Sequence, residues 1–459
     1  MSVIENKLRI LNDDPRSITL LSALGEDSDL HIVGGAVRDL LIGRNITDID
    51  YASSKDPDSI ISLLEREGIK VIPTGLSHQT VTAKPHSNLP HVEITSFRSH
   101  GMNPEGGLCL GKSIEEDLMF RDFTINSLAL KITSSESYSP VLIDPYGGKN
   151  DIQNKIIRGT VDPGARFEED PLRILRMIRF STQLGFEIEP DTLRKGISLA
   201  DTLYNSSIER IREEFLKILV SPFLRPGFRI LEKINFFENL MPEINRCQGF
   251  EQNKFHRHDV YEHTIDVLEM VPSTPLLRMA TLLHDVGKPP SLSIDNNGER
   301  HFYLHEKIGA DMVNEILSRF KFSNEFINAV ELLVRTHMRP IDAGDGGLRR
   351  ILRDTSPYYN EWRELKYFDT LSVTEDKTRL DKEFRIFDER IEGILSSAEE
   401  KPFAKLNITG SDLIELGFKP GPLFKDILNF LSDAVIENPD INEKNRLIEL
   451  LKSKFYREN

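Results

Sequence analysis

The feature that most constrains the fold is a pair of glycines between two short apolar segments, in the stretch HIVGGAVRDL. Residues 31–33 fit a buried strand and residues 36–42 a short apolar helix, so Gly34 and Gly35 are expected at the turn between them. Glycine lets a ligand approach the backbone, and a helix N-terminus offers N–H groups to an anion. With Arg38 in the first turn of the helix, this segment predicts a phosphate-binding site.

Carboxylates follow on two predicted strands. In the strand expected over residues 47–52, side chains alternate, so Asp48 and Asp50 share one face while Ile49 points to the core. Glu93, in the strand pattern HVEITSFR, is a candidate third carboxylate. Carboxylates on one face repel each other unless a cation joins them, and oxygen ligands suit Mg²⁺. A solvated strand edge is the plain alternative, but the glycine turn upstream favours a metal site.

Composition restricts the classes of protein. A chain of 459 residues is too long for one core and predicts three or four domains. It has no apolar run long enough to cross a bilayer, and MSVIENKLRI lacks the pattern of a signal peptide, so we expect a cytoplasmic protein without a membrane partner. Cys109 and Cys247 support neither a disulfide framework nor a cysteine-rich zinc site. The net charge of −15 argues against non-specific binding of nucleic acid, so any RNA contact is expected to be local.

One segment departs from the acidic average, since residues 158–233 hold 13 Lys and Arg against 12 Asp and Glu. Within it, EEDPLRILRMIRF predicts a helix with Asp170 at the N-cap. Arg173, Arg176 and Arg179 then recur every third residue. Arginine and aspartate side chains offer donors and acceptors to a base edge, whereas the alternative is a capped helix with a basic solvent face.

A family resemblance emerges from these motifs together. GGAVRD with DID, then RDFTIN, DPYGGKNDI and EEDPLRILR, in this order, resemble the CCA-adding tRNA nucleotidyltransferases and bacterial poly(A) polymerases over about residues 25–245. The resemblance implies a head of the DNA polymerase beta superfamily, with catalytic Mg²⁺ held by Asp48 and Asp50 and with Glu93 beside them. It also implies a nucleotide site made of Gly34, Gly35, Arg38, Arg121, Asp122, Asn126, Asp170, Arg173 and Arg176, in which Asp170 and Arg173 recognise the base.

The chain departs from the family pattern in two places. Phe120 stands where the family usually has the first of two arginines before the aspartate of RDFTIN. The segment between Arg98 and Glu115 lacks the usual Asp-Arg-Arg-Pro pattern. These departures leave open whether C, C and A are all added or only part of that sequence.

The second half of the chain carries dispersed histidines and aspartates. The adjacent pair His284 and Asp285 follows an apolar run on a predicted helix, and the others lie on separate helical segments that could converge. The pattern resembles the HD-domain metal phosphohydrolases over about residues 250–375. That resemblance implies one divalent transition metal on His263, His284, Asp285 and Asp369, and a second metal or a phosphate on His305 and His337.

The expected architecture is multidomain and mainly α. It consists of an α+β nucleotidyltransferase head (1–155), an all-helical neck (156–245), an HD body (246–380) and a helical tail (381–459). The tail pattern ITGSDLIELGFKPGPLFKDIL predicts turn, helix, turn and helix, and it suits a cap on the HD body as well as an RNA contact.

The function implied is addition of CCA, or part of it, to the tRNA acceptor end from CTP and ATP by a two-metal mechanism, with phosphohydrolase activity on 3′-end phosphates. A poly(A) polymerase is the first alternative, although the acidic chain lacks a basic tail. A protein-nucleotidylating regulator with an HD domain is the second, but regulatory modules after that domain are missing. An inactive nucleotide sensor or RNA-binding protein is disfavoured by the filled carboxylate positions. The oligomeric state and the metal of the HD domain are left open.

Overall fold

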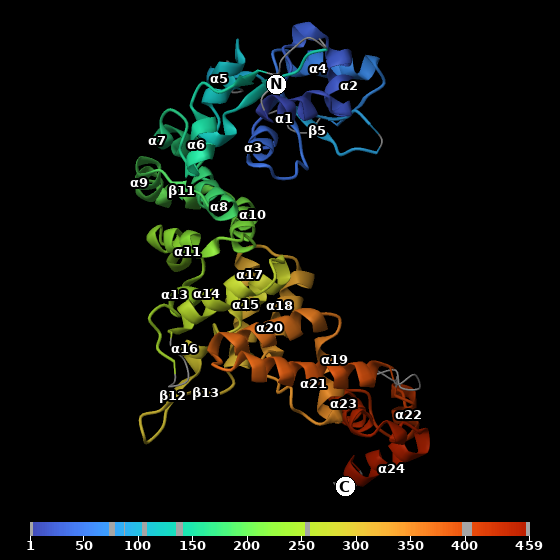
Figure 1. Cartoon of the computed structure of the whole chain (residues 1–459). Helices are drawn as coiled ribbons and strands as arrows, with labels where there is room; N and C mark the ends of the chain where they lie inside the picture. The colour runs from blue at the N-terminus through green and yellow to red at the C-terminus, as the bar shows by residue number, and fades with distance from the viewer. Residues whose placement is uncertain are drawn as a thin grey trace. The chain divides into compact units, whose positions relative to one another are not determined.

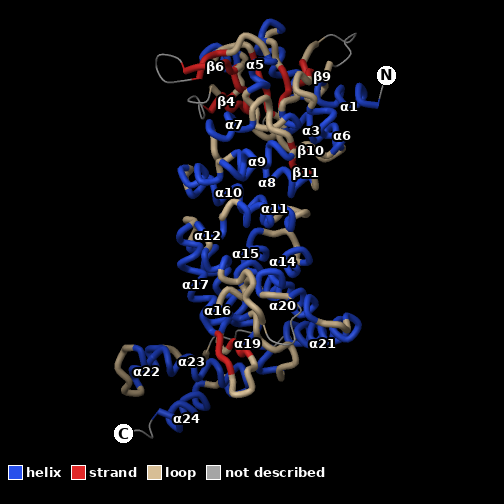
Figure 2. The backbone as a smooth tube through the Cα atoms, turned by 90° about the vertical axis from the view of Figure 1, so that its left-hand side faces the viewer, coloured by secondary structure: helices blue, strands red, loops and turns tan. Residues whose placement is uncertain are grey.

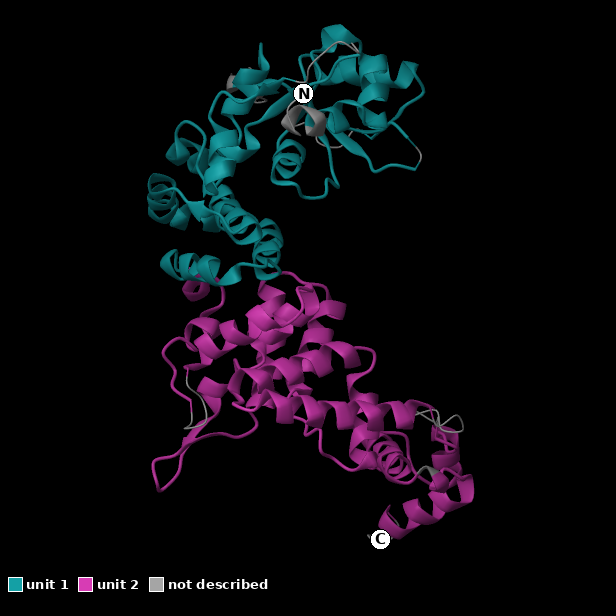
Figure 3. Ribbon diagram, viewed as in Figure 1, with its two compact units in different colours: residues 1–235 teal, residues 236–459 magenta. Residues whose placement is uncertain are grey.

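The structure, a computed structural model, describes residues 3–72, 79–86, 88–102, 108–134, 141–252, 258–396 and 406–455. The chain forms two compact units, residues 1–235 and 236–459 (Figure 3). Most strands lie in the first unit, and the second unit is almost wholly helical (Figure 2). The expectation of a multidomain, mainly α protein with an α+β head is confirmed.

The head, blue to teal in Figure 1, is built on a mixed sheet. The sheet has seven strands in the order β3-β4-β5-β2-β1-β8-β9. Its strands are β1 (His31–Val33), β2 (Asp50–Ser53), β3 (Lys70–Ile72), β4 (Thr80–Lys84), β5 (Val92–Ser96), β8 (Ala129–Lys131) and β9 (Leu142–Ile143). β2 and β5 run parallel, and the other neighbours are antiparallel. The predicted strand, glycine turn and helix are confirmed, because β1 leads through Gly34 into α3 (Gly35–Ile42). A separate pair is formed by β6 (Arg98–Met102) and β7 (Leu108–Leu110).

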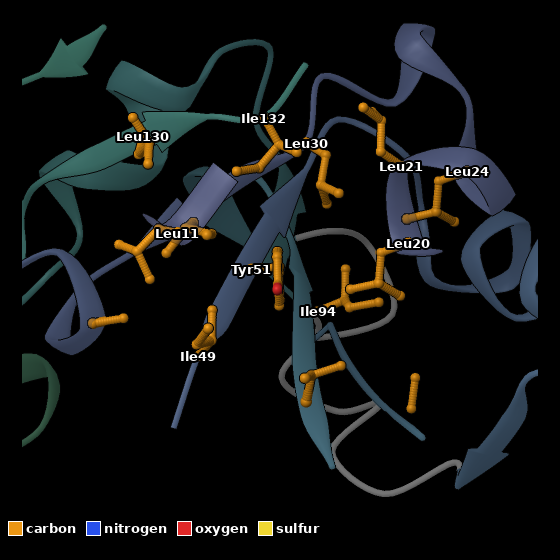
Figure 4. Packing of buried hydrophobic residues seen from close by; sticks show 14 of the residues in the cluster. Leu11, Leu20, Leu21, Leu24, Leu30, Ile49, Tyr51, Ile94, Leu130 and Ile132 are labelled. Atoms are coloured by element: carbon orange, nitrogen blue, oxygen red, sulfur yellow. The ribbon is translucent and has the colours of Figure 1, made fainter. Parts of the chain in front are cut away.

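The head core joins the sheet to helices α1 (Val3–Asn12), α2 (Pro15–Leu24) and α4 (Pro57–Arg66). Tyr51 and Leu130 are fully buried in it (Figure 4). Ile49 is only 2% exposed and belongs to the same core, so the flanking Asp48 and Asp50 turn to the opposite, exposed side. Burial of one apolar side chain therefore fixes the direction of the two carboxylates.

The remainder of the first unit is largely helical. It contains α5 (Ile114–Met119), α6 (Gly148–Asn154), α7 (Pro163–Glu169), α8 (Arg173–Leu184), α9 (Pro190–Ser198), α10 (Ile208–Leu219) and α11 (Leu224–Lys233). α8 packs against both α10 and α11. The short strands β10 (Ile156–Ile157) and β11 (Glu187–Ile188) pair in parallel, which adds a small β element to the expected helical neck.

Two predicted element starts are wrong. The strand expected over residues 47–52 begins only at Asp50. The helix expected to start with Asp170 as N-cap begins at Arg173, after a turn that follows α7. Asp170 does accept a hydrogen bond from the amide of Leu172 at 3.3 Å, as an N-cap would, but its other oxygen is bound by Arg210 of α10 at 2.9 Å, and residues 171–172 form a turn before the helix.

The second unit is a helical body followed by a helical tail. The body contains α12 (Phe236–Leu240), α13 (Pro242–Asn245), α14 (Val260–Met270), α15 (Pro275–Leu283), α16 (Lys288–Ser291), α17 (His305–Arg319), α18 (Asn324–Thr336), α19 (Asp345–Thr355), α20 (Tyr359–Val373) and α21 (Lys377–Ser396), with a hairpin of β12 (Leu292–Ile294) and β13 (Arg300–Phe302). The tail contains α22 (Gly410–Glu415), α23 (Pro422–Glu437) and α24 (Lys444–Phe455), which share a core of their own. The tail's turn and helix pattern is confirmed, since Thr409 forms a capping box at the start of α22. None of the helices in the described part of the chain is long and apolar enough to cross a membrane.

Candidate functional site

The first unit contains a cleft of about 1210 Å³ between the head sheet and the neck helices. The structure brings to this one cleft all twelve residues that the sequence analysis places in the head and neck sites: Gly34, Gly35, Arg38, Asp48, Asp50, Glu93, Arg121, Asp122, Asn126, Asp170, Arg173 and Arg176. They come from segments as far apart as β1 and α8. The cleft is therefore the candidate site of the first unit.

Three carboxylates lie at one end of adjacent strands. Asp50 opens β2 and stands in register with Glu93 on the parallel strand β5, and Asp48 lies two residues before Asp50. Burial raises the pKa of Asp50 and Asp48 adds to the rise, while burial and the charge of Asp50 raise the pKa of Glu93. Within the described residues, these three do not form a group with all ligand atoms inside 4.8 Å. The crowded oxygens suit a hard divalent cation that keeps some of its waters.

The glycine turn beside these carboxylates requires glycine at its first position. Gly34 has φ +70°, and a Cβ there would lie 3.0 Å from a guanidinium nitrogen of Arg121. α3 starts at Gly35, so its first N–H groups and the positive end of its dipole are available at the cleft. This local geometry fits the binding of a phosphate group.

A chain of hydrogen bonds links the head to the neck across the cleft. Arg38 donates to Asn126 Oδ1 at 2.6 Å, and Asn126 donates to Asp122 Oδ1 at 2.9 Å. Arg176 of α8 then donates to Asp122 Oδ2 through Nε at 2.8 Å and a second nitrogen at 2.5 Å. Burial would raise the pKa of Asp122, but Arg176 and the Asn126 hydrogen bond outweigh it and hold the pKa below its ordinary value. Asp122 is therefore an ionised anchor that orients both arginines.

Sequence reasoning missed Asp117, which holds two arginines of the same cleft. Its carboxylate is fully buried and binds two cleft arginines, Arg98 at 2.8 Å and Arg121 at 3.1 Å. Burial would raise its pKa, but the two guanidinium groups lower it overall. The available signal was its position four residues before Arg121, the spacing of a helical ion pair.

The residues expected to recognise the base are held by different partners. Asp170 is bound by Arg210, whereas Arg173 donates to the carbonyl of Phe120 at 3.0 Å and to Glu169 at 3.0 Å. Phe120, the residue that departs from the family pattern, lines the cleft beside them. The Phe120 carbonyl thus orients Arg173. Because this contact uses the backbone, the replacement of arginine by phenylalanine at position 120 does not predict it.

The second unit brings together the six residues of the histidine pattern. They form two groups, His263 with His284 and Asp369, and Asp285 with His305 and His337, and within each group the ligand atoms lie inside 4.8 Å. His263 Nε2 lies 3.1 Å from Asp369 Oδ1, and His305 Nε2 lies 3.4 Å from Asp285 Oδ1. His284 and Asp285 lie just beyond the C-terminal end of α15 rather than on the helix, which differs from the prediction.

Every imidazole in these groups is oriented by a second contact. Nδ1 of His284, His305 and His337 lies 2.7, 2.9 and 2.7 Å from the backbone carbonyls of Thr281, Phe302 and Val334, and Nδ1 of His263 lies 3.2 Å from the Ser372 hydroxyl. Each Nε2 is thereby left to face the carboxylates, and Nε2 of His284 is buried with no hydrogen-bond partner in the described structure. Four oriented imidazoles and two carboxylates fit divalent transition metals.

Burial and the carboxylates act in opposite directions on the imidazoles of the histidine site. Burial lowers the pKa of an imidazole, but Asp285 and Asp369 outweigh burial at His284 and raise its pKa. At His337, burial and the neighbouring His284 lower the pKa. Sequence reasoning missed Lys288, whose Nζ lies 2.5 Å from Asp285 Oδ2 and donates to Gln252 at 2.7 Å.

Comparisons with known proteins agree with this arrangement. Family models match at residues 30–158 (Poly A polymerase head domain), 185–248 (probable RNA and SrmB-binding site of polymerase A) and 260–386 (HD domain). The fold resembles that of the Bacillus stearothermophilus CCA-adding enzyme in complex with CTP, with a TM-score of 0.69 and 24% identity over 100% of this chain and 99% of that one.

Two curated relatives extend the match in sequence. The CCA-adding enzyme of Geobacillus sp. is 29% identical over 92% of this chain and 92% of its own length. The A-adding tRNA nucleotidyltransferase of Deinococcus radiodurans is 30% identical over 88% of this chain and 90% of its own length. With the motifs, the fold and both sites in agreement, the chain belongs to the tRNA nucleotidyltransferase family, in an arrangement that carries an HD domain.

Proposed function

We propose that this chain adds nucleotides of the CCA sequence to the 3′ end of tRNA, using CTP, ATP or both in the cleft of the first unit. The observation that carries the proposal is the convergence of twelve motif residues on that cleft. The names of the curated relatives, an A-adding tRNA nucleotidyltransferase and CCA-adding enzymes, support a tRNA end over a poly(A) tail or a protein as the acceptor.

The roles of the residues follow from their contacts. Gly34, the start of α3 and Arg38 hold the triphosphate, because they offer N–H donors and positive charge. Asp48, Asp50 and Glu93 hold Mg²⁺, which when bound would supply positive charge beside the attacking hydroxyl and the leaving pyrophosphate. Because the transfer needs no covalent nucleophile from the protein, the chain's main task is to position the reactants and neutralise their charge.

Base selection is assigned to the start of the neck. Asp170 offers an acceptor and Arg173 offers donors to a base edge. The base would take the place of Arg210 as the partner of Asp170, and of the Phe120 carbonyl as the partner of Arg173.

One assay tests the proposed reaction and measures how many nucleotides are added. Purified protein is incubated with tRNAs lacking CCA, lacking CA or lacking only A, each with a single nucleotide, and the products are sized. Extension of only the tRNA that lacks A would identify an A-adding enzyme, and extension of none would refute the proposal.

A second activity is favoured by the oriented imidazoles of the second unit. We infer that the six-residue site binds a divalent transition metal, which would polarise a phosphoester and favour deprotonation of a water. Removal of a terminal phosphate or 2′,3′-cyclic phosphate would expose the hydroxyl that the head requires.

The metal and the hydrolysis are tested separately. Metal content is measured after loading with Ni²⁺, Co²⁺, Mn²⁺ or Mg²⁺, and phosphate release is measured with 2′,3′-cyclic nucleotides. His263→Ala is expected to lose bound metal. Asp295→Ala, which removes a carboxylate from an exposed acidic group on the β12–β13 hairpin, is expected to keep it. Metal retention without phosphate release would leave the site as a structural one.

A further inference from the structure

One aromatic ring in the cleft is contacted by three arginines. The guanidinium carbons of Arg38, Arg176 and Arg179 lie 5.1, 5.5 and 4.4 Å from the centroid of the Phe180 ring. Each distance is within the range of a cation–π interaction. Phe180 is only 5% exposed, yet it lines the cleft, so its ring forms part of the wall.

These contacts belong to a closed circuit of interactions between α3 and α8. Arg38 lies on α3 of the head, whereas Arg176 and Phe180 lie one turn apart on α8 of the neck. The hydrogen bonds from Arg38 through Asn126 and Asp122 to Arg176 form one side of this circuit. The Phe180 ring completes the circuit, because Arg38 and Arg176 both contact the ring.

We propose that Phe180 is a positioning residue for nucleotide binding, which holds Arg38 and Arg176 in place and so couples the triphosphate end of the cleft to the base-recognising end of α8. The proposal rests on the assignment of Arg38 and Asp122 to the nucleotide site. Phe180 itself need not touch the nucleotide.

The need for such a ring follows from the charge of the wall. Three guanidinium groups gathered near one point repel each other, although each has a carboxylate partner, Asp39 for Arg38, Asp122 for Arg176 and Glu214 for Arg179. Burial together with Arg176 still lowers the pKa of Arg179 to about 10. Arg179 has one carboxylate partner, Glu214 at 3.0 Å, and its Nε has no hydrogen-bond partner in the described structure. The negative face of an aromatic ring offsets part of this repulsion without competing for the hydrogen bonds that a phosphate requires. It also adds to the restriction that Asn126 and Asp122 already impose on Arg38 and Arg176 before the nucleotide binds.

Graded fluorination tests the ring's electrons apart from its size. Phenylalanine carrying one, two or three fluorines is incorporated at position 180, and KM and kcat for CTP and ATP are measured alongside the melting temperature. We expect KM to rise with each fluorine, to about tenfold in total, with kcat within about threefold of wild type and little change in melting temperature. A flat KM across the series would overturn the proposal.

Two substitutions complete the test. Phe180→Leu is expected to raise KM about tenfold, and Phe180→Tyr, which keeps the ring, is expected to stay near wild type. Phe228→Leu removes a fully buried ring from α11, outside the residues described as lining the cleft, and should lower stability without raising KM. Equal rises in KM for the two Leu variants would reduce Phe180 to a packing role.

Failure of the underlying site assignment is distinguishable. If Arg38→Ala leaves KM for both nucleotides unchanged, the proposed nucleotide site is wrong. If Arg38→Ala raises KM and the fluorinated series does not, only the role of Phe180 is refuted.

Discussion

Asp122 offers the sharpest test of how the head cleft is held together. Its carboxylate accepts hydrogen bonds from the amide of Phe123 at 2.9 Å, from Asn126 at 2.9 Å, and from two nitrogens of Arg176 at 2.8 and 2.5 Å. In Asp122→Asn, one oxygen can keep the first two bonds. The other becomes an amide group that donates and cannot accept from Arg176.

The size of the effect follows from the burial of the pair. Breaking a buried ion pair from one side costs about 3–5 kcal/mol. The Arg176 side chain is 33% exposed, so water compensates part of the loss, and a cost of about 3 kcal/mol is expected. With a urea slope of about 3 kcal/mol per M, the midpoint of head unfolding should fall by about 1 M.

The assay combines a probe of the whole chain with a probe of the second unit. Far-UV circular dichroism follows helices in both units, whereas the chain's single tryptophan, Trp362, reports on the second unit and should be unaffected. Asp191→Asn, which removes an exposed ion pair with Arg194 in the same unit as Asp122, is the matched control and should leave the midpoint unchanged. Equal midpoints for the two variants would refute the reasoning.

The pH dependence of stability tests the same carboxylate independently. The pKa of Asp122 is lowered in the folded state, so its stabilisation is complete above the unfolded-state pKa of about 4 and is lost as the pH falls further. Wild type should therefore lose more stability than Asp122→Asn between about pH 5 and pH 2. Parallel pH profiles would show that the group is not an ionised anchor.

The remaining predictions concern chemistry. Asp50→Ala and Asp48→Ala should each abolish nucleotide addition, measured by product sizing, and leave phosphate release intact; near-normal addition by both would contradict the metal assignment. Arg173→Ala should reduce discrimination among CTP, ATP, GTP and UTP more than it slows a saturated reaction, and an unchanged preference would favour a purely structural arginine. Asp285→Ala should stop phosphate release but spare addition to tRNA with a clean 3′-hydroxyl, since the two sites lie in different units, so loss of both activities would contradict separate sites.

Sequence patterns predicted best what is determined locally. The strand, glycine turn and helix at residues 31–42 follow from spacing and backbone freedom, and the direction of Asp48 and Asp50 follows from one buried neighbour, Ile49. Contacts over long separations were not predictable in this way. Arg176 donates to Asp122, from which it is separated by 54 positions in the chain. Nothing in the local sequence of either residue indicates the other.

The errors have the same origin. Asp170 has the composition of an N-cap, but its carboxylate binds Arg210, 40 residues later, and the helix starts elsewhere. Asp117 and Lys288 stand at helical spacing from Arg121 and Asp285, but spacing alone does not show that the fold buries these pairs. At Asp170 and Asp117, long-range contacts with Arg210 and Arg98 outweigh local propensity.

The histidine site has a consequence for the order in which the chain matures. His263 and Asp369 meet across 106 residues. At about 5–20 residues per second, a ribosome needs about 5–20 s to add Asp369 after His263. A nascent chain interrupted in that interval has α14 but no α20, and it cannot assemble the complete ligand set. Metal held by the group of His263, His284 and Asp369 would thus require a chain translated and folded through α20, whereas the group of Asp285, His305 and His337 is complete once α18 has been made.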